Sequence, residues 1–394
     1  MPTAPHRDWI VIREGRNQRW GGELRRRQIF SRLAERTGAR VIESGWYPNL
    51  IRRAAFGDSF TFVPGPLLRF LPGPRPRPLF AASEKLRDRL LAAAIAVTDP
   101  AVVAVYDDPV AQSHALGVNR DPAWLAEVAA RQRRNVEAFR WHVVPTRSFA
   151  VLAHLDPDRV IVGGNGTDVR RIQVGPWPSR PVVGLVSGAA PGRGIETLVD
   201  AVAAARADEP DVELWMWLIA TGDDSARYLD GLRAEHLGRP WVHIGDAPHG
   251  QLGEALERAS ILCIPHPPND YMDVALPVKL FDSLAAGRPL IVTPRTETAA
   301  IVRAHDVGVV SGGDRPEDLA EAIVGLLHDP DRMRRLGERA RLAAEEHFDW
   351  RIVGDRIADA VLSREGWSGP TTTSTAGPTT TSTAGPTTTS TAGP

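Results

Sequence analysis

Short apolar runs alternate with amphipathic stretches along most of the chain. In the first half, apolar runs of strand length fall at 9–12, 39–43, 59–63, 101–106 and 141–145. Stretches with apolar residues at helical spacing lie between them, as at 23–36 and 122–139. The second half repeats the pattern with the runs PVVGLV, VELWMWLIA, WVHIG, SILCIP, PLIVT and VGVV. This alternation predicts an α/β fold of parallel sheets with helices on both faces.

The alternation is long enough for two such sheets. The chain has 394 residues, of which 43% are hydrophobic, so it can bury two cores. The segment QVGPWPSRP at 173–181 holds three prolines and a glycine, which is typical of a linker. We therefore expect Rossmann-like domains over 1–172 and 182–348, joined by this linker. A last helix within 349–368 is expected to return to the first domain.

The C-terminus has a different composition. Residues 371–394 repeat TTTSTAGP three times without a mismatch. The repeat carries no large apolar side chain, so burial cannot offset the entropy lost on ordering. We expect 369–394 to be a disordered tail.

Charge and cysteine content narrow the function classes. The formal net charge is −1, so no overall basic field favours nucleic acid. The single cysteine, Cys263, excludes an internal disulfide framework. No signal-like apolar region opens the chain, and no apolar run reaches the length of a membrane span. These features together predict a cytoplasmic protein.

Polar or glycine-rich stretches follow several of the predicted strands. In open α/β sheets, ligands bind beyond the carboxyl ends of the strands. Four stretches qualify: Gly21-Gly22 before a helix, Asp107-Asp108, Asn165-Gly166 followed by Asp168, and the loop SGAAPGRG with Arg193. Ordinary turn chemistry also explains a Gly-Gly pair or an Asp-Pro step, so each stretch alone leaves both interpretations open.

The segment ALPVKLFDSLAAG at 275–287 predicts a helix opened by Pro277. Of the 47 lysines and arginines, only Lys85 and Lys279 are lysines. Lys279 and Asp282 are three residues apart, so they share a helix face. One interpretation is a surface ion pair between them. The other is an anion site, because the free N–H groups of a first helical turn attract anions.

Four motifs, in order from about residue 20 to 360, resemble one family. They are GGELRR, VVPTRSF with DPDRVIVGGNGTDVRRI, GRGIETLVDA, and ALPVKLFDSLAAGRPLIVT. The set is similar to the retaining GT-B glycosyltransferases of the group 1 (family 4) type. The resemblance implies two Rossmann-like domains that face each other across a cleft, with the acceptor on the first and a nucleotide-sugar donor on the second.

The resemblance also implies roles for residues of the second domain. Arg193 and Lys279 match the cations that neutralise the donor diphosphate. Asp282 matches the acid that accepts hydrogen bonds from the ribose hydroxyls, although the family usually has a glutamate there. Leu276 and Pro277 belong to the same donor motif.

Further positions follow from the same comparison of motifs. Backbone around Gly21, Gly22 and Gly188 would approach the phosphates. Asp273 is the acid nearest to the first position of the family's pair of acids, offset by one residue. Asp107 stands where many members carry a histidine and is a candidate catalytic group. The family needs no metal ion or cofactor beyond the donor, and the sequence shows no metal-ligand cluster.

The implied function is retaining transfer of a sugar from a nucleotide-diphosphate sugar to an unidentified acceptor. Two alternatives remain: a nucleotide-sugar 2-epimerase of the same fold, and an inactive partner subunit that binds sugar nucleotides. The basic, aromatic and Pro-rich stretch 50–80 suits peripheral contact with the inner face of a membrane, or a loop that shapes the acceptor pocket.

Overall fold

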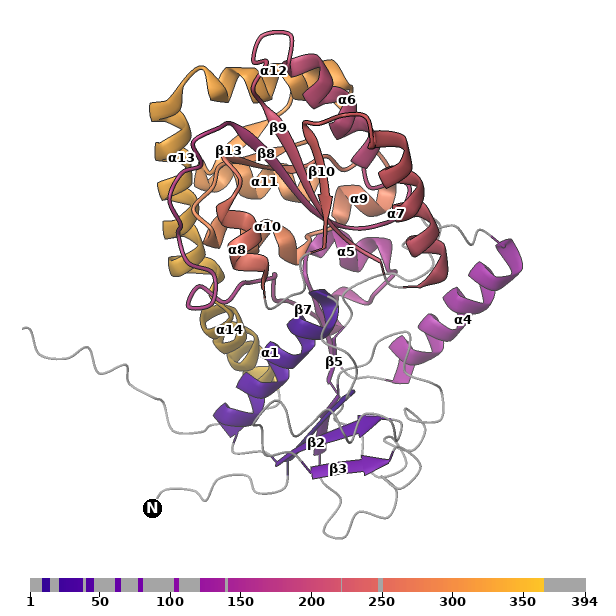
Figure 1. Cartoon of the computed structure of the whole chain (residues 1–394). Helices are drawn as coiled ribbons and strands as arrows, with labels where there is room; N and C mark the ends of the chain where they lie inside the picture. The colour runs from indigo at the N-terminus through magenta and orange to yellow at the C-terminus, as the bar shows by residue number, and fades with distance from the viewer. Residues whose placement is uncertain are drawn as a thin grey trace, which may run out of the picture.

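The computed structural model describes most of the second half of the chain and separate elements of the first half. The described residues are 9–14, 21–37, 40–45, 61–64, 77–80, 103–105, 121–138, 141–220, 222–246 and 251–364. They form two groups of strands and helices, one above the other in Figure 1. Asp107, the tail over 369–394 and most of the stretch 50–80 lie outside these residues.

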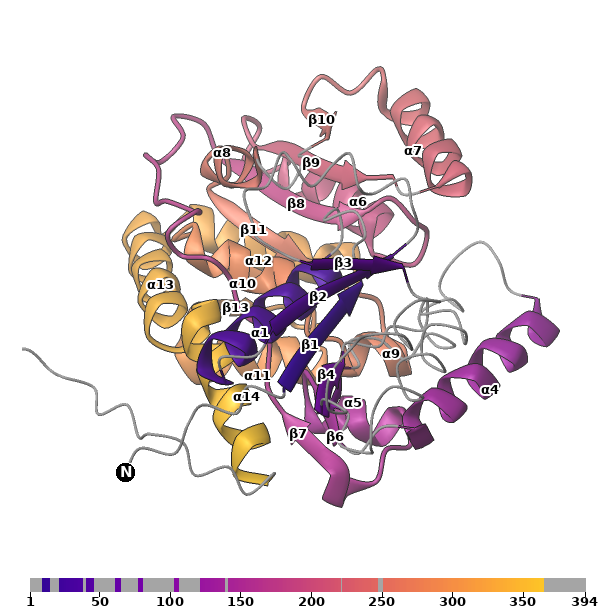
Figure 2. The same cartoon turned by 90° about the horizontal axis from the view of Figure 1, so that it is seen from below.

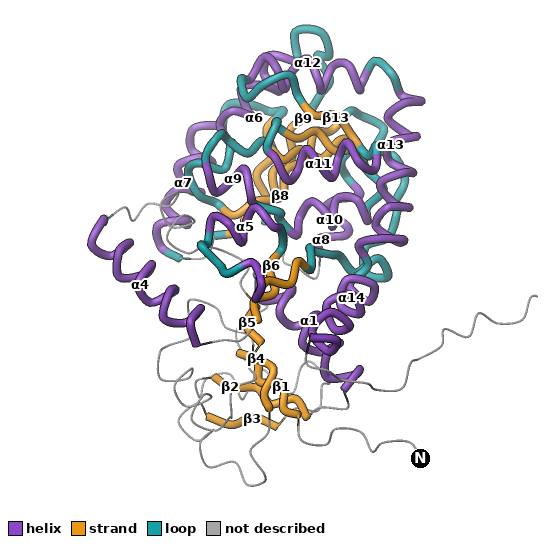
Figure 3. The backbone as a smooth tube through the Cα atoms, turned by 180° about the vertical axis from the view of Figure 1, so that it is seen from behind, coloured by secondary structure: helices purple, strands orange, loops and turns teal. Residues whose placement is uncertain are grey.

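The N-terminal group contains two small parallel sheets. The first has the order β3-β2-β1-β4, with β1 at Trp9–Glu14, β2 at Arg40–Gly45, β3 at Thr61–Pro64 and β4 at Arg77–Phe80. The second has the order β5-β6-β7, with β5 at Val103–Val105, β6 at Trp141–Val144 and β7 at Val160–Val162. Strands β4 and β5 are in contact, so the two sheets continue one another (Figure 3). The helices of this group are α1 at Gly21–Thr37, α4 at Pro122–Ala138 and α5 at Arg147–Leu152, with a short 3₁₀ helix at Pro157–Arg159.

The C-terminal group is built on one six-stranded parallel sheet. Its strands are β8 at Val182–Gly188, β9 at Glu213–Ile219, β10 at Val242–Gly245, β11 at Ile261–Ile264, β12 at Leu290–Val292 and β13 at Gly308–Val310. The order is β10-β9-β8-β11-β12-β13, so the chain builds outward from β8 and then restarts at β11 on its other side (Figure 2). This is the strand order of a Rossmann sheet, and it reverses between β8 and β11.

Helices cover both faces of this sheet because its strands are apolar on both sides. They are α6 at Ile195–Ala205, α7 at Asp223–His236, α8 at Leu252–Glu257, α9 at Asp270–Val274, α10 at Val278–Ala285, α11 at Thr296–His305, α12 at Pro316–Leu327 and α13 at Pro330–Ala343. One core lies under α8, α10, α11 and α13, and a second under α6, α7 and α12. Every residue of β11 and β12 is buried between the two cores. None of the helices in the described ranges is long and apolar enough to cross a membrane.

The last helix lies against the first. A π-helical turn at Ala344–Phe348 leads into α14 at Trp350–Arg364, which packs along α1 (Figures 1 and 3). Arg32 of α1 donates to both carboxylate oxygens of Asp355 at 2.6 and 2.8 Å. Beneath this ion pair, Ile29, Leu33 and Ile357 are fully buried against one another's helices. The C-terminal helix therefore contributes to the core of the N-terminal group.

The predicted α/β fold with parallel sheets is confirmed. The five strands expected in the first half all form, and their bounds differ from the apolar runs by a few residues. Gly21 and Gly22 form the first turn of α1 instead of a loop before it. Residues 173–181 contain no helix or strand, and the assigned domain boundaries stay predictions.

Removing the Ile357 side chain tests the contribution of α14. The side chain fills the space beside Gly163, where a Cβ would lie 2.5 Å from the Ile357 Cδ1 atom. We expect Ile357→Ala to lower the free energy of unfolding by roughly 2–5 kcal/mol, because it leaves a cavity in a close-packed core. Urea denaturation measures the change. Ile352→Ala, at a 38% exposed position on the same helix, is the control and should cost less than about 1 kcal/mol. Equal losses would mean that α14 does not pack as described.

Candidate functional site

The candidate site lies where the strand order of the C-terminal sheet reverses. Strand β8 ends at Gly188 and its neighbour β11 ends at Ile264, so the loops that follow them leave the same edge of the sheet. These loops turn to opposite faces, because β8 leads to β9 and β11 leads to β12. Ligands of open α/β sheets bind in the crevice at such a point.

Two cations gather at this edge. Lys279, in the first turn of α10, donates from Nζ to Ser187 Oγ at 3.4 Å, next to the end of β8. Burial and then the charge of Arg193 lower the pKa of the Lys279 ammonium to about 7. Within the described part of the chain, neither Arg193 nor Lys279 forms an ion pair with an acid. The edge therefore carries positive charge that forms no ion pair with a carboxylate of the described residues.

His266 belongs to the same site, and the sequence analysis missed it. It lies two residues after the end of β11 and is only 1% exposed. Burial, and then the charges of Lys279 and Arg193, hold the pKa of its imidazole well below the ordinary value. A polar residue directly after the apolar run SILCIP was the available signal, the same one that singled out Asp107. We call Ser187, Arg193, His266 and Lys279 the cationic cluster.

The backbone beside the cationic cluster is in close contact with Pro265 at Gly194, and it borders open space at Gly188. Gly194 has φ +75°, and a Cβ there would lie 1.7 Å from the carbonyl oxygen of Pro265. Only glycine allows the loop that carries Arg193 to approach the end of β11 so closely. A Cβ at Gly188 would instead meet no atom within 4 Å. The space beside the Gly188 backbone is open.

Asp282 and Lys279 have different hydrogen-bond partners. Its carboxylate is 5% exposed and accepts a hydrogen bond from Thr167 Oγ1 at 2.8 Å. Burial raises the pKa of this carboxyl to about 7, although the Thr167 hydroxyl acts in the opposite direction. No ion pair joins Lys279 and Asp282 among the residues that the structure describes. The surface ion pair considered from the sequence is therefore not formed.

The segment before α10 is held by the N-terminal group. Asn165 Nδ2 donates to the Leu276 carbonyl oxygen at 2.5 Å. Arg25 of α1, itself 1% exposed, donates to Asn165 Oδ1 and to the Gly164 carbonyl oxygen. Pro277 follows with extended backbone angles, as the residue that precedes the first turn of α10. These contacts fix where α10 begins, and with it the position of Lys279.

Other predicted site residues are placed differently. Asp273 of α9 accepts from Arg295 Nη1 at 3.1 Å, and Arg295 also binds both carboxylate oxygens of Asp314 at 2.7 Å. The Asp273 carboxylate is thus engaged in an ion pair. Gly21 and Gly22 lie in α1. Their expected roles, like that of Asp107, stay predictions.

A search for metal ligands gives no candidate within the described ranges. No group of three or more His, Cys, Asp or Glu side chains there could hold a metal ion. The expectation that no metal is needed stays a prediction.

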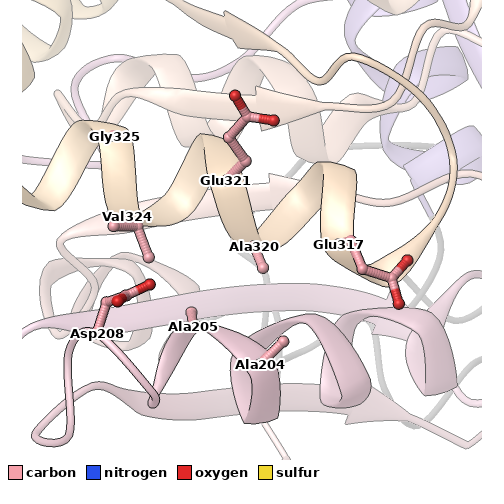
Figure 4. A pocket seen from close by; sticks show the side chains of 8 residues that line it. All are labelled: Ala204, Ala205, Asp208, Glu317, Ala320, Glu321, Val324 and Gly325. Atoms are coloured by element: carbon pink, nitrogen blue, oxygen red, sulfur yellow. The ribbon is translucent and has the colours of Figure 1, made fainter.

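A cavity of about 460 Å³ lies elsewhere, between α6 and α12 (Figure 4). Its lining residues are small or acidic: Ala204, Ala205, Asp208, Glu317, Ala320, Glu321, Val324 and Gly325. Three carboxylates make it unsuited to a phosphate group, and no member of the cationic cluster lines it. This cavity is therefore not the candidate functional site.

The family model and the relatives that match this chain are of the same kind. The model of the family described as "Glycosyl transferases group 1" matches residues 180–329. A GDP-mannose-dependent monoacylated alpha-(1-6)-phosphatidylinositol monomannoside mannosyltransferase of Corynebacterium glutamicum is 27% identical over 202 residues, which are 49% of this chain and 50% of the relative. A D-inositol 3-phosphate glycosyltransferase of Nocardia farcinica is 25% identical over 229 residues, 54% of this chain and 49% of the relative. The chain thus spans about half the length of the curated relatives it matches.

Comparison of the folds extends over almost the whole chain. The crystal structure of Anabaena Alr3699/HepE in complex with UDP and glucose has a TM-score of 0.68 and 14% sequence identity. The similarity covers 91% of this chain and 100% of the other. Together with two groups of parallel strands and an anion-attracting edge, it defines the class of protein: a GT-B fold. Residues 180–329 match the glycosyl transferases of group 1, and the relatives and the fold are similar to the same family, which supports the resemblance noted from the motifs.

The buried carboxyl of Asp282 generates a prediction about stability and pH. Its folded pKa lies above the unfolded value, so the folded protein holds a proton between about pH 4 and 7 that the unfolded chain releases. Its contribution to stability therefore falls as pH rises through this window, and the cost of the buried charge is complete above pH 7. We expect Asp282→Asn to raise the free energy of unfolding at pH 8 by roughly 1–3 kcal/mol, and to leave it nearly unchanged at pH 4.5.

Urea denaturation at the two pH values measures this effect. Asp168→Asn, at a neighbouring carboxylate whose side chain is 35% exposed, is the matched control and should shift stability little at either pH. An Asp282→Asn protein that is less stable than the parent at pH 8 would show that the carboxylate stabilises the fold.

Proposed function

We propose that this protein is a glycosyltransferase that moves a sugar, with retention, from a nucleotide-diphosphate sugar to a hydroxyl acceptor. One observation carries the proposal: Arg193 and Lys279 meet at the reversal of the Rossmann sheet without an acidic partner in the described part of the chain. Two uncompensated cations beside open backbone at Gly188 suit a diphosphate. The similarity of residues 180–329 to group 1 glycosyl transferases supports the same donor class.

The reaction would place these cations where negative charge develops. The bond between the anomeric carbon and the diphosphate oxygen breaks, and its electron pair stays on the diphosphate. The acceptor oxygen forms the new bond to the anomeric carbon, and its proton passes to the released diphosphate. Preorganised cations stabilise such a leaving group more in the transition state than in the ground state. Arg193 and Lys279 are therefore the proposed catalytic residues for which the structure gives positions.

Asp282 would bind the nucleotide through its free oxygen. Thr167 holds Oδ1, and Oδ2 accepts no hydrogen bond from the residues that the structure describes. A ribose hydroxyl can donate to Oδ2 without displacing Thr167. Donation from Thr167 orients the carboxylate, which suits an aspartate that is one methylene shorter than the family's usual glutamate.

The relatives suggest which donors and acceptors to try first. The printed names include a GDP-mannose-dependent mannosyltransferase and a D-inositol 3-phosphate glycosyltransferase, and the structural neighbour was solved with UDP and glucose. We infer a hexose donor on GDP or UDP and an acceptor with an inositol hydroxyl. A lipid-linked acceptor would suit membrane contact through 50–80 at the cytoplasmic face.

A product assay tests this function. Purified protein is incubated with GDP-mannose or UDP-glucose and with D-inositol 3-phosphate or phosphatidylinositol in detergent, and glycosylated products are identified by mass spectrometry. Release of nucleoside diphosphate together with a new glycoside supports the proposal. An isomerised sugar without a glycoside would favour the 2-epimerase. Tight nucleotide binding without any turnover would favour a partner subunit.

Substitution of Lys279 separates a catalytic cation from a structural one. We expect Lys279→Ala to lower kcat about 10²–10³-fold, because one preorganised charge contact to the leaving group is lost. Lys279→Arg should recover only part of the rate, because a guanidinium is larger and binds as a planar fork. Steady-state kinetics and melting curves give both readouts. Arg233→Ala, an exposed cation on α7, is the control, and a near-normal kcat for Lys279→Ala would exclude the assigned role.

The lowered pKa of Lys279 makes donor binding depend on pH. In the empty site the ammonium loses its proton near pH 7, whereas a bound diphosphate favours the charged form and raises this pKa. Above pH 7, binding must therefore take up a proton, and the affinity for UDP or GDP should fall as pH rises from 7 to 9, by up to about tenfold per pH unit. Calorimetric titration in buffers of different ionisation enthalpy counts the protons. Lys279→Arg keeps its charge, so it should abolish the uptake; an unchanged slope would assign the proton to another group.

A further inference from the structure

His266 is a buried polar group without a hydrogen-bond partner. Its side chain is almost fully enclosed, and neither Nδ1 nor Nε2 has a partner among the residues that the structure describes. Buried polar atoms in native proteins are nearly always satisfied, so an exception requires an explanation. A ligand that is absent from the described chain is one such explanation.

The backbone of His266 is fixed from two sides. Its carbonyl oxygen accepts from Thr293 Oγ1 at 2.6 Å, at the end of β12. The preceding residue, Pro265, is in close contact with Gly194 in the loop that carries Arg193. The backbone of His266 therefore has a defined place relative to the loop that carries Arg193.

The charges around the ring suit an anion and not a further cation. Lys279, Arg193 and Arg295 all act on the imidazole. Arg295 is neutralised by Asp273 and Asp314, whereas Arg193 and Lys279 pair with no acid in the described ranges. A third positive charge at this point would be repelled. A neutral imidazole instead offers one N–H donor without adding positive charge.

We propose that His266 is a ligand of the donor diphosphate, and that one ring N–H donates to a phosphate oxygen held by Arg193 and Lys279. The inference rests on the proposed function, because it uses the same anion site. It adds a neutral donor to the two cations and accounts for the missing partner of one ring nitrogen. Because the contact is made to phosphate, it contributes equally to the binding of a nucleoside diphosphate and of a nucleotide sugar.

Replacement of the ring by an apolar side chain tests the proposal. We expect His266→Leu to bind UDP and GDP roughly tenfold to a hundredfold more weakly, the worth of a hydrogen bond to a charged group. Its melting temperature should stay the same or rise, because an unsatisfied buried polar group is removed. His266→Gln, whose amide N–H also donates, should recover part of the affinity. Isothermal titration calorimetry and melting curves on the full chain supply both measurements.

His236→Leu is the matched control. His236 is also buried, at 6% exposure, and its Nδ1 also has no partner in the described part of the chain. It lies at the carboxyl end of α7, which runs back toward the opposite edge of the sheet. This variant should bind nucleoside diphosphates as the parent does.

The outcomes distinguish this proposal from the proposed function. Inorganic diphosphate is titrated beside UDP and GDP, because its binding requires no base, ribose or turnover. If the parent binds diphosphate, His266→Leu weakens it and no glycoside forms in the product assay, the ligand role stands and the proposed function fails. Parent-like affinity in a folded His266→Leu protein overturns the ligand role alone. A His266→Leu protein that melts well below the parent would overturn it too, because the ring would then be needed for packing.

Discussion

Positive charge that pairs with no acid among the described residues is the constraint on the loops around Arg193 and Lys279. Arg193 lies close enough to Lys279 to lower the pKa of its ammonium, because a nearby like charge disfavours the charged form. The chain holds them there with neutral contacts: Ser187 for Lys279, and the fit of Gly194 against Pro265 for the loop of Arg193. On the proposed function, a phosphate ligand would supply the missing negative charge.

A second charged group, Asp282, is also held in α10 in an environment that disfavours its charge. Asp282 is buried with a hydroxyl as its hydrogen-bond partner, and its raised pKa shows that the fold disfavours its charge. A cation and an acid three residues apart would ordinarily pair on a helix surface. Here each is held by a different part of the molecule, Lys279 by the end of β8 and Asp282 by Thr167. In the proposed function, this separation leaves Lys279 for the phosphates of the donor and Asp282 for its hydroxyls.

The N-terminal group sets the position of these residues without supplying them. Arg25 reaches from α1 to Asn165, and Asn165 binds the backbone directly before α10. Helix α14 then returns along α1 and buries Ile357 there. These hydrogen bonds join helix α1 of the N-terminal group to the backbone directly before α10. The two groups of elements are therefore held together by buried hydrogen bonds as well as by the packing of α14 on α1.

Local pattern determined much of this protein by itself. Apolar runs and helical spacing predicted the strands and helices. The spacing of apolar residues within a short segment reflects whether one face of the element or both are buried. The Pro-opened helix and the cations Arg193 and Lys279 were likewise identified from short motifs. Only the tertiary structure decided the partners. His266 joins Arg193 because β11 lies beside β8, and Asp282 faces Thr167 because the two halves meet at α10. Such contacts join residues that are far apart in the chain, and no local periodicity specifies which strand ends share an edge.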